Sequence, residues 1–515
     1  MAEGVADTVL ERISSARTDR SRMAGRINRF YELALPHRQL VGTKSDTPRD
    51  PGEQDDIFDS TLQDTVDDFA SDMLDAFTPH YKPWVAIAPS ETLGTGEQQQ
   101  FKESVKRYED VLYAEILAST FYQESQECWV ELAGAAAGML IPWTPNGRQI
   151  RPQPILMSNL LMDHGPNGEL DGRWFEMKVA KCHLRTAFPM VKWDAHEAFS
   201  KKNCDDDYRA VDVIQGAYAD HDGKGEAVYF CVYADGKKVH LKRLSGVGAS
   251  PIVAMRWRTS PPSAWGPGPG QKGVSPGGAL NELSYLVLKH LGKQADPPML
   301  YDEDGLFNPE MGVNAGESYA RRAGSKFDFL VTEQDLQTAF FEQNDLRMAV
   351  RRALYQDKPF QRADTPPTAA QWLDEKATND KRLQLARMRI YDEWVIPVLQ
   401  RFAWILQRRG VLPDVAIKGK IIGVRYVNPL SRASDMEDVT RASQFLQIVN
   451  GAFPQTAQAS IDSFQTMANI KEKMGEELVV LKKPDQQAQL IQEILKGGKG
   501  NGPAAAQVGG SPPAA

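Results

Sequence analysis

Residues 260–298 read SPPSAWGPGPGQKGVSPGGALNELSYLVLKHLGKQADPP, and no other stretch says more about the fold. Its first half is crowded with proline and glycine, which interrupt regular structure and predict a rigid turn. In its second half apolar residues recur at helical spacing from Leu280 to Leu291, and Asp296 followed by two prolines ends the pattern. We therefore predict a turn that aims a helix over residues 279–293.

The same turn contains a formal GxGxxG match that begins at Gly268 and ends at Gly273. A dinucleotide-binding fingerprint needs a strand before it, a helix opening inside it and an acidic residue about 20 positions later. Here prolines flank the glycines at Pro267 and Pro269, and Pro276 follows closely. The match is weak, so we favour the turn, and nucleotide binding is the rival interpretation.

The residues before this stretch begin as amphipathic helices and continue as strands. Helices are predicted over 8–35, from Leu62 to Phe77, over 98–118 and over 121–138. After them come short segments rich in β-branched and aromatic residues, over 138–143, 148–156, 173–180, 227–234, 237–244 and 251–257. Hairpin-turn dipeptides occur at Asn146-Gly147, Asn167-Gly168 and Asp235-Gly236. These segments predict a small mixed sheet over 138–258.

The residues after this stretch are mainly helical. Short strands and loops are predicted over 299–342, and a basic helix follows over 345–358. A long helix from about Thr368 to Arg409 would span about 60 Å; Pro397 should kink it, and Gly410 with Pro413 should end it. Further helices are predicted over 434–451 and 456–475, and the Gly/Ala/Pro-rich end should be disordered. The fold class is therefore α+β, mainly helical.

Composition narrows the function classes. A chain of 515 residues can form several subdomains, and its net charge of -8 argues against a protein that reads DNA sequence through a basic surface. That charge is compatible with a protein through which DNA passes without tight phosphate contacts. There is no apolar run of about 18 residues and no apolar segment near the start, so neither a membrane span nor a signal peptide is expected.

No catalytic, cofactor-binding or metal-binding residues can be assembled from the sequence. The four cysteines are scattered without a CxxC pair, which predicts incidental thiols made in a reducing cytoplasm. Patterns typical of P-loop ATPases, α/β-hydrolases, zinc proteases and EF-hands are all missing from the 515 residues. We therefore do not expect an enzyme or a cofactor.

The order of these features resembles the portal proteins, or head-to-tail connectors, of podovirus-type bacteriophages. The segments that carry the resemblance are Tyr31–Pro36, Ile57–Thr61, Phe121–Glu124 before a GAAAG run, the Trp265-Gly266 turn with Asp296-Pro297-Pro298, and Thr368-Ala369-Ala370. They span about residues 1–430. The family commonly has an acidic residue soon after Thr-Ala, but here Gln371 and Trp372 come before Asp374, which leaves the exact length of the loop before Thr368 open.

The resemblance implies a portal fold with wing, stem, clip and crown that assembles into a ring of about twelve copies. The implied regions are a wing over 1–260, a turn and first stem helix over 261–294, a clip over 295–344, a second stem helix over 345–358, a tunnel loop over 359–368, a long kinked helix returning to the wing over 369–429, a crown over 430–485, and a short helix with a disordered tail over 486–515.

The resemblance also implies partners and a location. Such a ring would sit at one capsid vertex of the virion after assembly in the host cytoplasm. It would contact the terminase motor, a tail adaptor, and the major capsid and scaffold proteins, while double-stranded DNA passes through it non-specifically. We expect these residues near the DNA path: Arg347, Arg351, Arg352, Lys358, Gln361 and Arg362, with Lys289 and Lys293 as secondary candidates.

Three rival functions stay open. One is an enzyme that uses the Gly-rich turn for a nucleotide. The second is another structural module, such as a tail adaptor or a scaffold, although those are usually much shorter. The third is a nucleic-acid enzyme of the packaging machine, which would need a P-loop or a cluster of metal-binding carboxylates.

Overall fold

The computed structural model describes most of the chain. The described residues are 2–42, 56–80, 83–89, 95–196, 199, 208–221, 227–261, 263–295, 299–302, 318–321, 337–356, 382–383, 386–413, 415, 422–426, 429–452, 461 and 463–474. They fall into two compact units, Met1–Tyr426 and Val427–Ala515. Most strands lie between residues 136 and 256, away from the long helices, and pair antiparallel, so the fold is α+β.

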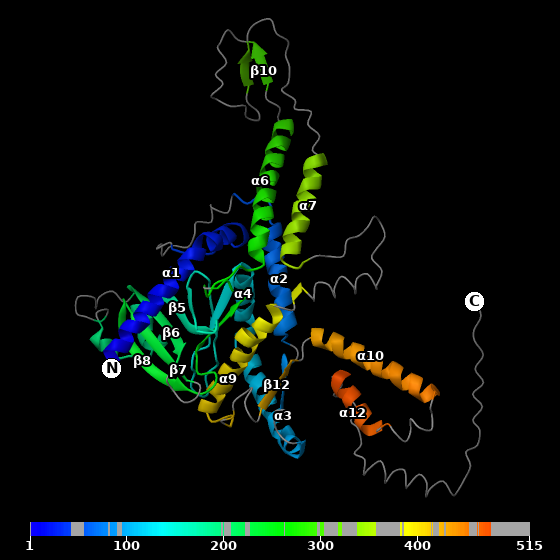
Figure 1. Ribbon diagram of the computed structural model, residues 1–515. Helices are drawn as coiled ribbons and strands as arrows, with labels where there is room; N and C mark the ends of the chain where they lie inside the picture. Colours follow the sequence, from blue (N-terminus) through cyan, green and yellow to red (C-terminus); the bar gives the residue numbers. More distant parts are fainter. Residues whose placement is uncertain are drawn as a thin grey trace. The chain divides into compact units, whose positions relative to one another are not determined.

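The predicted N-terminal helices are present (Figure 1). They are α1 (Ala2–Ala34), α2 (Thr61–Phe77), α3 (Thr95–Ala118) and α4 (Phe121–Gly134). The last is shorter than the prediction over 121–138, because the small-residue run after Gly134 continues as strand β2 (Ala136–Leu140). All five residues of β2 are buried, so close packing overrides their weak strand propensity.

Two antiparallel sheets replace the single mixed sheet predicted over 138–258. Their strand orders are β3-β2-β9 and β4-β5-β6-β7-β8. The further strands are β3 (Gln153–Ile155), β4 (Leu160–His164), β5 (Leu170–Ala180), β6 (Ala210–Ala219), β7 (Ala227–Ala234), β8 (Lys237–Ser245) and β9 (Ile252–Arg256). The prediction missed β4 and β6. Strand β6 contains Gly216, a poor strand former, but the missing side chain there makes room for the Trp174 ring.

The hairpin turns follow the turn chemistry expected from the sequence. Asp235 and Gly236 have φ angles of 46° and 75°, the left-handed values that a tight turn between β7 and β8 requires. Gly168 has a φ of 81° between β4 and β5. Asn146-Gly147 also forms a turn, but it lies within a longer connection between β2 and β3.

The five-stranded sheet is covered on both faces. On one face Val9, Ile13 and Ala16 of α1 pack against Trp174 and Tyr233. The other face is covered by α5 (Lys181–Ala187) and the short 3-10 turn η2 (Trp193–Ala195), through residues such as Leu184 and Trp193. This two-sided burial explains why β6 and β7 are apolar on both faces.

The largest core joins segments far apart in the sequence. Trp84, Trp129, Trp265 and Trp394 are all fully buried in it. Strand β1 (Val85–Pro89) pairs antiparallel with β12 (Ile422–Tyr426), so residues near 90 and near 420 are neighbours. Most of the described residues up to Tyr426 therefore pack around one main core.

The described part of the long predicted helix contains the expected irregularity at proline. A π-helical turn, η6 (Tyr391–Val395), precedes α9 (Ile396–Arg408), and Pro397 lies at the start of α9. Since Pro397 has no N–H, the Glu393 carbonyl loses its helical partner, and the wider turn accommodates this. At the other end Gly410 has a φ of 74°, which confirms the predicted C-terminal cap. Residues 368–381 lie outside the described residues.

A buried arginine fastens α9 to the sheets. Arg401 is 2% exposed and donates hydrogen bonds to the carbonyls of Ile141 and Ala249 at 3.0 and 2.9 Å. Burial lowers the pKa of its guanidinium to about 9. Its planar head satisfies several carbonyl groups at once, which a lysine could not do with the same geometry.

The second unit contains two described helices, α10 (Pro429–Ala452) and α12 (Ser463–Met474), which contact each other. They lie where helices over 434–451 and 456–475 are predicted. Phe445 and Ile448 of α10 are 61% and 69% exposed. The short helix and tail over 486–515 lie outside the described residues.

The described cysteines are free thiols, as predicted. Burial raises the pKa of Cys128, and it raises the pKa of Cys231 to about 12. Both thiols therefore stay protonated and weakly reactive at neutral pH. Within the described residues no helix is long and apolar enough to cross a membrane, and no group of three or more His, Cys, Asp or Glu could hold a metal ion.

Candidate functional site: the α6–α7 helix pair and its root

Helices α6 (Gly270–Ala295) and α7 (Gln337–Ala353) run side by side and antiparallel (Figure 1). Gln343 Nε2 donates to Ser284 Oγ at 3.3 Å in the buried seam between them. Gly273, about three turns earlier in α6, faces Ala353 near the end of α7. These two contacts set the register of the antiparallel helices, with Ser284 opposite Gln343 and Gly273 opposite Ala353.

Both helices begin earlier than the sequence predicts. Helix α6 starts at Gly270 instead of residue 279, and its first turns include Pro276. Helix α7 starts at Gln337 and ends at Ala353, not over 345–358. Propensity disfavours a helix through glycine and proline, so tertiary packing must stabilise it.

That packing uses the glycines for close backbone approach. A Cβ atom at Gly268 would lie 2.3 Å from the Ala133 carbonyl oxygen, and one at Gly270 would lie 2.6 Å from the Phe30 ring. Cβ atoms at Gly273 and Gly277 would lie 3.2 and 3.1 Å from side-chain atoms of Leu62 in α2. The glycines therefore let α6 lie against α1, α2 and α4. Their role in helix packing explains the GxGxxG match without a nucleotide.

The segment before α2 holds the pair on one side. Asn281 Oδ1 accepts a hydrogen bond from the Phe58 N–H at 2.6 Å, and the Phe58 ring lies 4.9 Å from the Tyr285 ring. Asp59 accepts from the Thr61 N–H at 2.9 Å and forms an ion pair with Arg347 at 2.8 Å. Asp59 thus fixes the start of α2 and links it to α7.

The ion pair makes a prediction about Asp59→Asn. Burial alone would raise the pKa of Asp59, but hydrogen bonds from Thr61 and Arg347 outweigh it and lower that pKa. The stabilisation is therefore present above the unfolded pKa of about 4 and is lost as the pH falls through the lower folded value. We expect Asp59→Asn to cost about 1 kcal/mol at pH 7 and less at pH 3, measured by chemical unfolding.

The matched control for that prediction is Asp75→Asn, on the exposed side of the same helix. It should leave stability within about 0.5 kcal/mol at both pH values. An equal loss in both variants would show that the Asp59–Arg347 pair contributes nothing specific.

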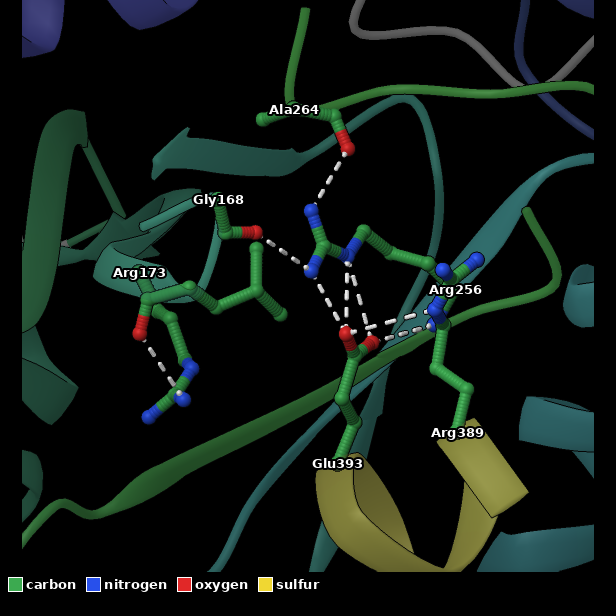
Figure 2. Close-up of polar contacts among 7 residues, drawn as sticks. Gly168, Arg173, Arg256, Ala264, Arg389 and Glu393 are labelled. Carbon is green, nitrogen blue, oxygen red and sulfur yellow. Dashed lines mark hydrogen bonds and ion pairs between the residues drawn. The ribbon is translucent and has the colours of Figure 1, made fainter. Parts of the chain in front are cut away.

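A buried ion pair lies beneath the root of α6 (Figure 2). Arg256, at the end of β9, is 3% exposed, and its Nη2 lies 2.5 Å from Oε1 of Glu393 in the π-helical turn. The Arg256 backbone N–H and Nε donate to the same carboxylate. Figure 2 shows the carboxylate directed at the guanidinium from below, while the Ala264 carbonyl accepts from Nη1 and the Gly168 carbonyl accepts from Nη2, each at 3.3 Å.

The turn that leads into α6 is held by the same network. Asp19 of α1 accepts hydrogen bonds from Ser263 Oγ at 2.7 Å and from the Ala264 N–H at 3.0 Å. Because Arg256 binds the carbonyl of Ala264, one residue of this turn is fixed from two sides. Strand β9, helix α1 and the π-helical turn therefore all set the direction in which α6 leaves the core.

A second guanidinium, that of Arg173, lies close to Arg256 and adds repulsion between like charges. Arg173 of β5 donates to the Leu170 carbonyl at 3.1 Å, and its pKa is lowered by burial. The Arg256 charge lowers the pKa of Arg173 further, and the Glu393 carboxylate raises it. Glu393 thus compensates two buried cations, and Arg389 lies 3.9 Å from it on the exposed side.

The residues predicted to lie near DNA fall at two levels of the pair. Arg351 and Arg352 are exposed at the root end of α7, whereas Lys289 and Lys293 belong to the far half of α6. Since Ser284 is level with Gln343, the two groups are about 20–25 Å apart along the axis at 1.5 Å per residue. They form no single cluster.

Other predicted residues have different surroundings. Arg347 is paired with Asp59 and 38% exposed. Lys358, Gln361 and Arg362, with the tunnel loop over 359–368, lie outside the described residues. The sequence analysis missed Asn281, Glu393 and Arg256. One signal for Glu393 was available, since it is a charged residue one position from Trp394 in an apolar helical stripe.

Large apolar side chains remain exposed on both helices of the pair. They are Tyr285, Leu286, Leu288 and Leu291 on α6, and Phe340, Phe341 and Met348 on α7. Phe341 is 71% exposed and Leu288 is 53% exposed. A contiguous pair of helices with this much apolar surface is typical of a protein that buries it against another chain.

Comparisons with known proteins give a family match. A family model described as "Bacteriophage head to tail connecting protein" matches residues 6–480. The chain is also similar to a solved structure titled "Virion of native gene transfer agent (GTA) particle", with a TM-score of 0.35 and 11% identity over 86% of this chain and 98% of that chain.

A second solved structure, titled "Neck of native GTA particle computed with C12 symmetry", has the same TM-score of 0.35, identity of 11% and coverage of 86% and 98%. A third, titled "Neck of empty GTA particle computed with C6 symmetry", has a TM-score of 0.34 and 12% identity over the same shares. None of the curated proteins matches the chain.

Proposed function

The chain belongs to the family of bacteriophage head to tail connecting proteins, and from this premise we propose that it is the portal subunit of a short-tailed phage. About twelve copies close into a ring at one vertex of the capsid. DNA enters through the ring during packaging and leaves through it during ejection. The packaging motor docks on the ring first, and the tail adaptor replaces it. The role is structural, without a catalytic step.

The observation that carries this proposal is the exposed apolar surface of the α6–α7 pair. An isolated chain would leave Leu288 and Phe341 in water, at a cost of about 25 cal/mol for each Å² of apolar surface. In a ring the α7 face of one copy packs against the α6 face of the next. Such a head-to-tail interface repeats without a free edge when the rotation closes.

The regions of the proposed portal follow the chain. Residues 1–260 form the wing, α6 and α7 form the stem, and the segment between them forms the clip that faces the motor. Strands β10 (Met299–Asp302) and β11 (Ser318–Arg321), which pair in parallel, belong to that clip. Residues 359–368 form the tunnel loop, and 430–485 form the crown inside the capsid.

Basic residues in the ring would contact DNA weakly and repeatedly. Arg351 and Arg352 give one ring of positive charge, and Lys289 with Lys293 gives a second nearer the clip. Lys358, Gln361 and Arg362 lie next to the tunnel loop in this proposal. Contacts with phosphate alone carry no sequence information and weaken with salt, as passage of DNA requires.

The rival functions have less support. The Gly-rich stretch that a nucleotide enzyme would need is packed against Ala133 and Phe30, which fill the space beside Gly268 and Gly270. A packaging enzyme would need a carboxylate cluster for metal, and the described residues contain no such group.

The oligomeric state tests the proposal. We expect native mass spectrometry and negative-stain electron microscopy of the purified chain to give rings of about twelve copies with a central hole. Leu288→Glu combined with Phe341→Glu should shift the protein to monomers and small oligomers, because two charges would be buried at each interface. Leu117→Glu, which changes a 62% exposed leucine on α3, is the matched control.

A wild-type chain that stays monomeric at high concentration and across salt would refute the portal proposal. Rings that persist in the double variant, with its fold verified by circular dichroism, would refute the assignment of the α6–α7 faces to the interface.

A further inference from the structure

A groove of about 500 Å³ lies between the end of α1 and the start of α2. Its lining mixes apolar residues (Leu35, Pro36, Ile57 and Phe58) with polar ones, of which Gln63 and Asp67 of α2 form its polar end. Leu35 and Pro36 are buried. Phe58 is 38% exposed. An exposed aromatic ring close to a carboxylate suits a side chain with an apolar stem and a cationic head, which is the chemistry of arginine.

The polar end of the groove carries uncompensated negative charge. Asp64 and Asp67 are exposed on α2, one turn apart, and Glu127 of α4 is close to Asp67. Burial raises the pKa of Asp67, and the negative charges of Asp64, Glu127 and Asp68 raise it further. Carboxylates that repel one another in this way would be stabilised by an incoming cation.

The cations nearest to this end do not neutralise it. Arg38 is engaged with Glu127 and lies 3.3 Å from the buried Glu131. Burial and the Arg38 charge lower the pKa of His37, so its imidazole is neutral at pH 7. Across the residues that the structure describes, neither Asp64 nor Asp67 forms an ion pair with an arginine or lysine.

A complementary row of arginines lies on α1. Arg26 and Arg29 are exposed and, within the described part of the chain, take part in no ion pair. They are separated by one helical turn, about 4.5 Å along the axis, and so are Asp64 and Asp67 on α2. Arg351 and Arg352 are also exposed, but adjacent helical residues point about 100° apart and do not match that spacing.

We propose that the groove of one copy binds Arg26 and Arg29 of the neighbouring copy in the ring. This inference rests on the proposed function, because a closed ring brings two different surfaces of the same chain together. One arginine stem lies along the Phe58 ring while its guanidinium meets Asp67, and the second arginine meets Asp64. The contact fixes the register between copies, since a shift by one turn leaves one charge unpaired on each side.

Charge exchange between the two faces tests the proposal. The variants are Arg26→Glu with Arg29→Glu, Asp64→Arg with Asp67→Arg, and the combination of all four. Each double variant should reduce the fraction of chains in rings by about tenfold or more in native mass spectrometry at near-physiological salt. The four-fold variant, which restores opposite charges across the interface, should recover most of the rings.

Controls distinguish a loss of this contact from misfolding and from a failure of the proposed function. Asp75→Arg, on α2 outside the groove, should assemble normally, and circular dichroism should show each double variant to be folded. Folded double variants that form rings as the wild type does would overturn the inference while leaving the ring itself established. The inference is also overturned if Arg351→Glu with Arg352→Glu abolishes rings and the further addition of Asp64→Arg with Asp67→Arg restores them. The groove would then bind arginines of α7 instead of α1. A wild-type chain without rings would refute the proposed function instead.

Discussion

Replacing Glu393 with alanine should destabilise the first unit by about 3–5 kcal/mol, the usual loss when one partner of a buried ion pair is removed. Arg256 is 3% exposed, so its guanidinium would be left buried without the carboxylate that now accepts its hydrogen bonds. Arg173, buried beside it, would lose the negative charge that now favours its charged form. Equilibrium unfolding in urea, followed by tryptophan fluorescence, measures the loss, because the buried Trp394 is next to the mutated residue.

Two further variants decide whether the loss comes from the buried pair. Arg389→Ala removes a cation that is 34% exposed and 3.9 Å from Glu393, so it should cost less than about 1 kcal/mol. Arg256→Met combined with Glu393→Leu removes both charges and should recover part of the stability lost in Glu393→Ala. Equal losses in Glu393→Ala and Arg389→Ala would contradict the assignment of this effect to the buried pair.

The elements that the sequence predicted well are those with a strong local signal. Helix α2 repeats its apolar residues at steps of three and four, and all of these residues face the core, from Leu62 to Phe77. The Asp235-Gly236 turn and the Gly410 cap depend on left-handed backbone angles that few residues adopt. In each case a short stretch contains enough information to determine its own conformation.

The failures lie where distant segments determine the local structure. Residues 270–278 contain glycine and proline and look like a turn, yet they are helical because Phe30 and Leu62 accept them at close range. Strand β6 is stabilised by strands on both sides and by the Trp174 ring beside Gly216. No window of the sequence contains these partners, so local propensity gives the wrong answer.

The candidate site was predictable in part. The helix pair and its basic residues follow from periodicity and charge, and the family resemblance supplies their order. The Arg256–Glu393 pair does not follow, because the two residues are 137 positions apart and neither belongs to a motif. The Asp59–Arg347 pair is separated by 288 positions for the same reason. Long-range ion pairs of this kind become visible only when the fold brings the residues together.

Two identical substitutions in one segment should change stability in opposite directions. Gly268→Ala should destabilise the protein by about 1–3 kcal/mol or more, because its Cβ would lie 2.3 Å from the Ala133 oxygen and 2.5 Å from the Gly134 carbon. Both contacts are with backbone atoms, so no side-chain rotation relieves them. The N-terminus of α6 would have to move away from α4, which would also break the hydrogen bond from the Gly268 N–H to the Gly134 carbonyl.

Gly292→Ala, near the far end of α6, is the control, because nothing lies within 4 Å of its Cβ position. Alanine there should stabilise the protein by about 0.5–1 kcal/mol, since glycine loses more backbone freedom on folding. Both variants add one methyl group, Gly268→Ala in the turn before α6 and Gly292→Ala within the helix, so a loss of thermal stability confined to Gly268→Ala reports on the close packing at Gly268. If Gly268→Ala and Gly292→Ala change thermal stability equally, the turn before α6 cannot approach α4 as closely as described. The packing at the base of the helix pair would then differ from the one given above.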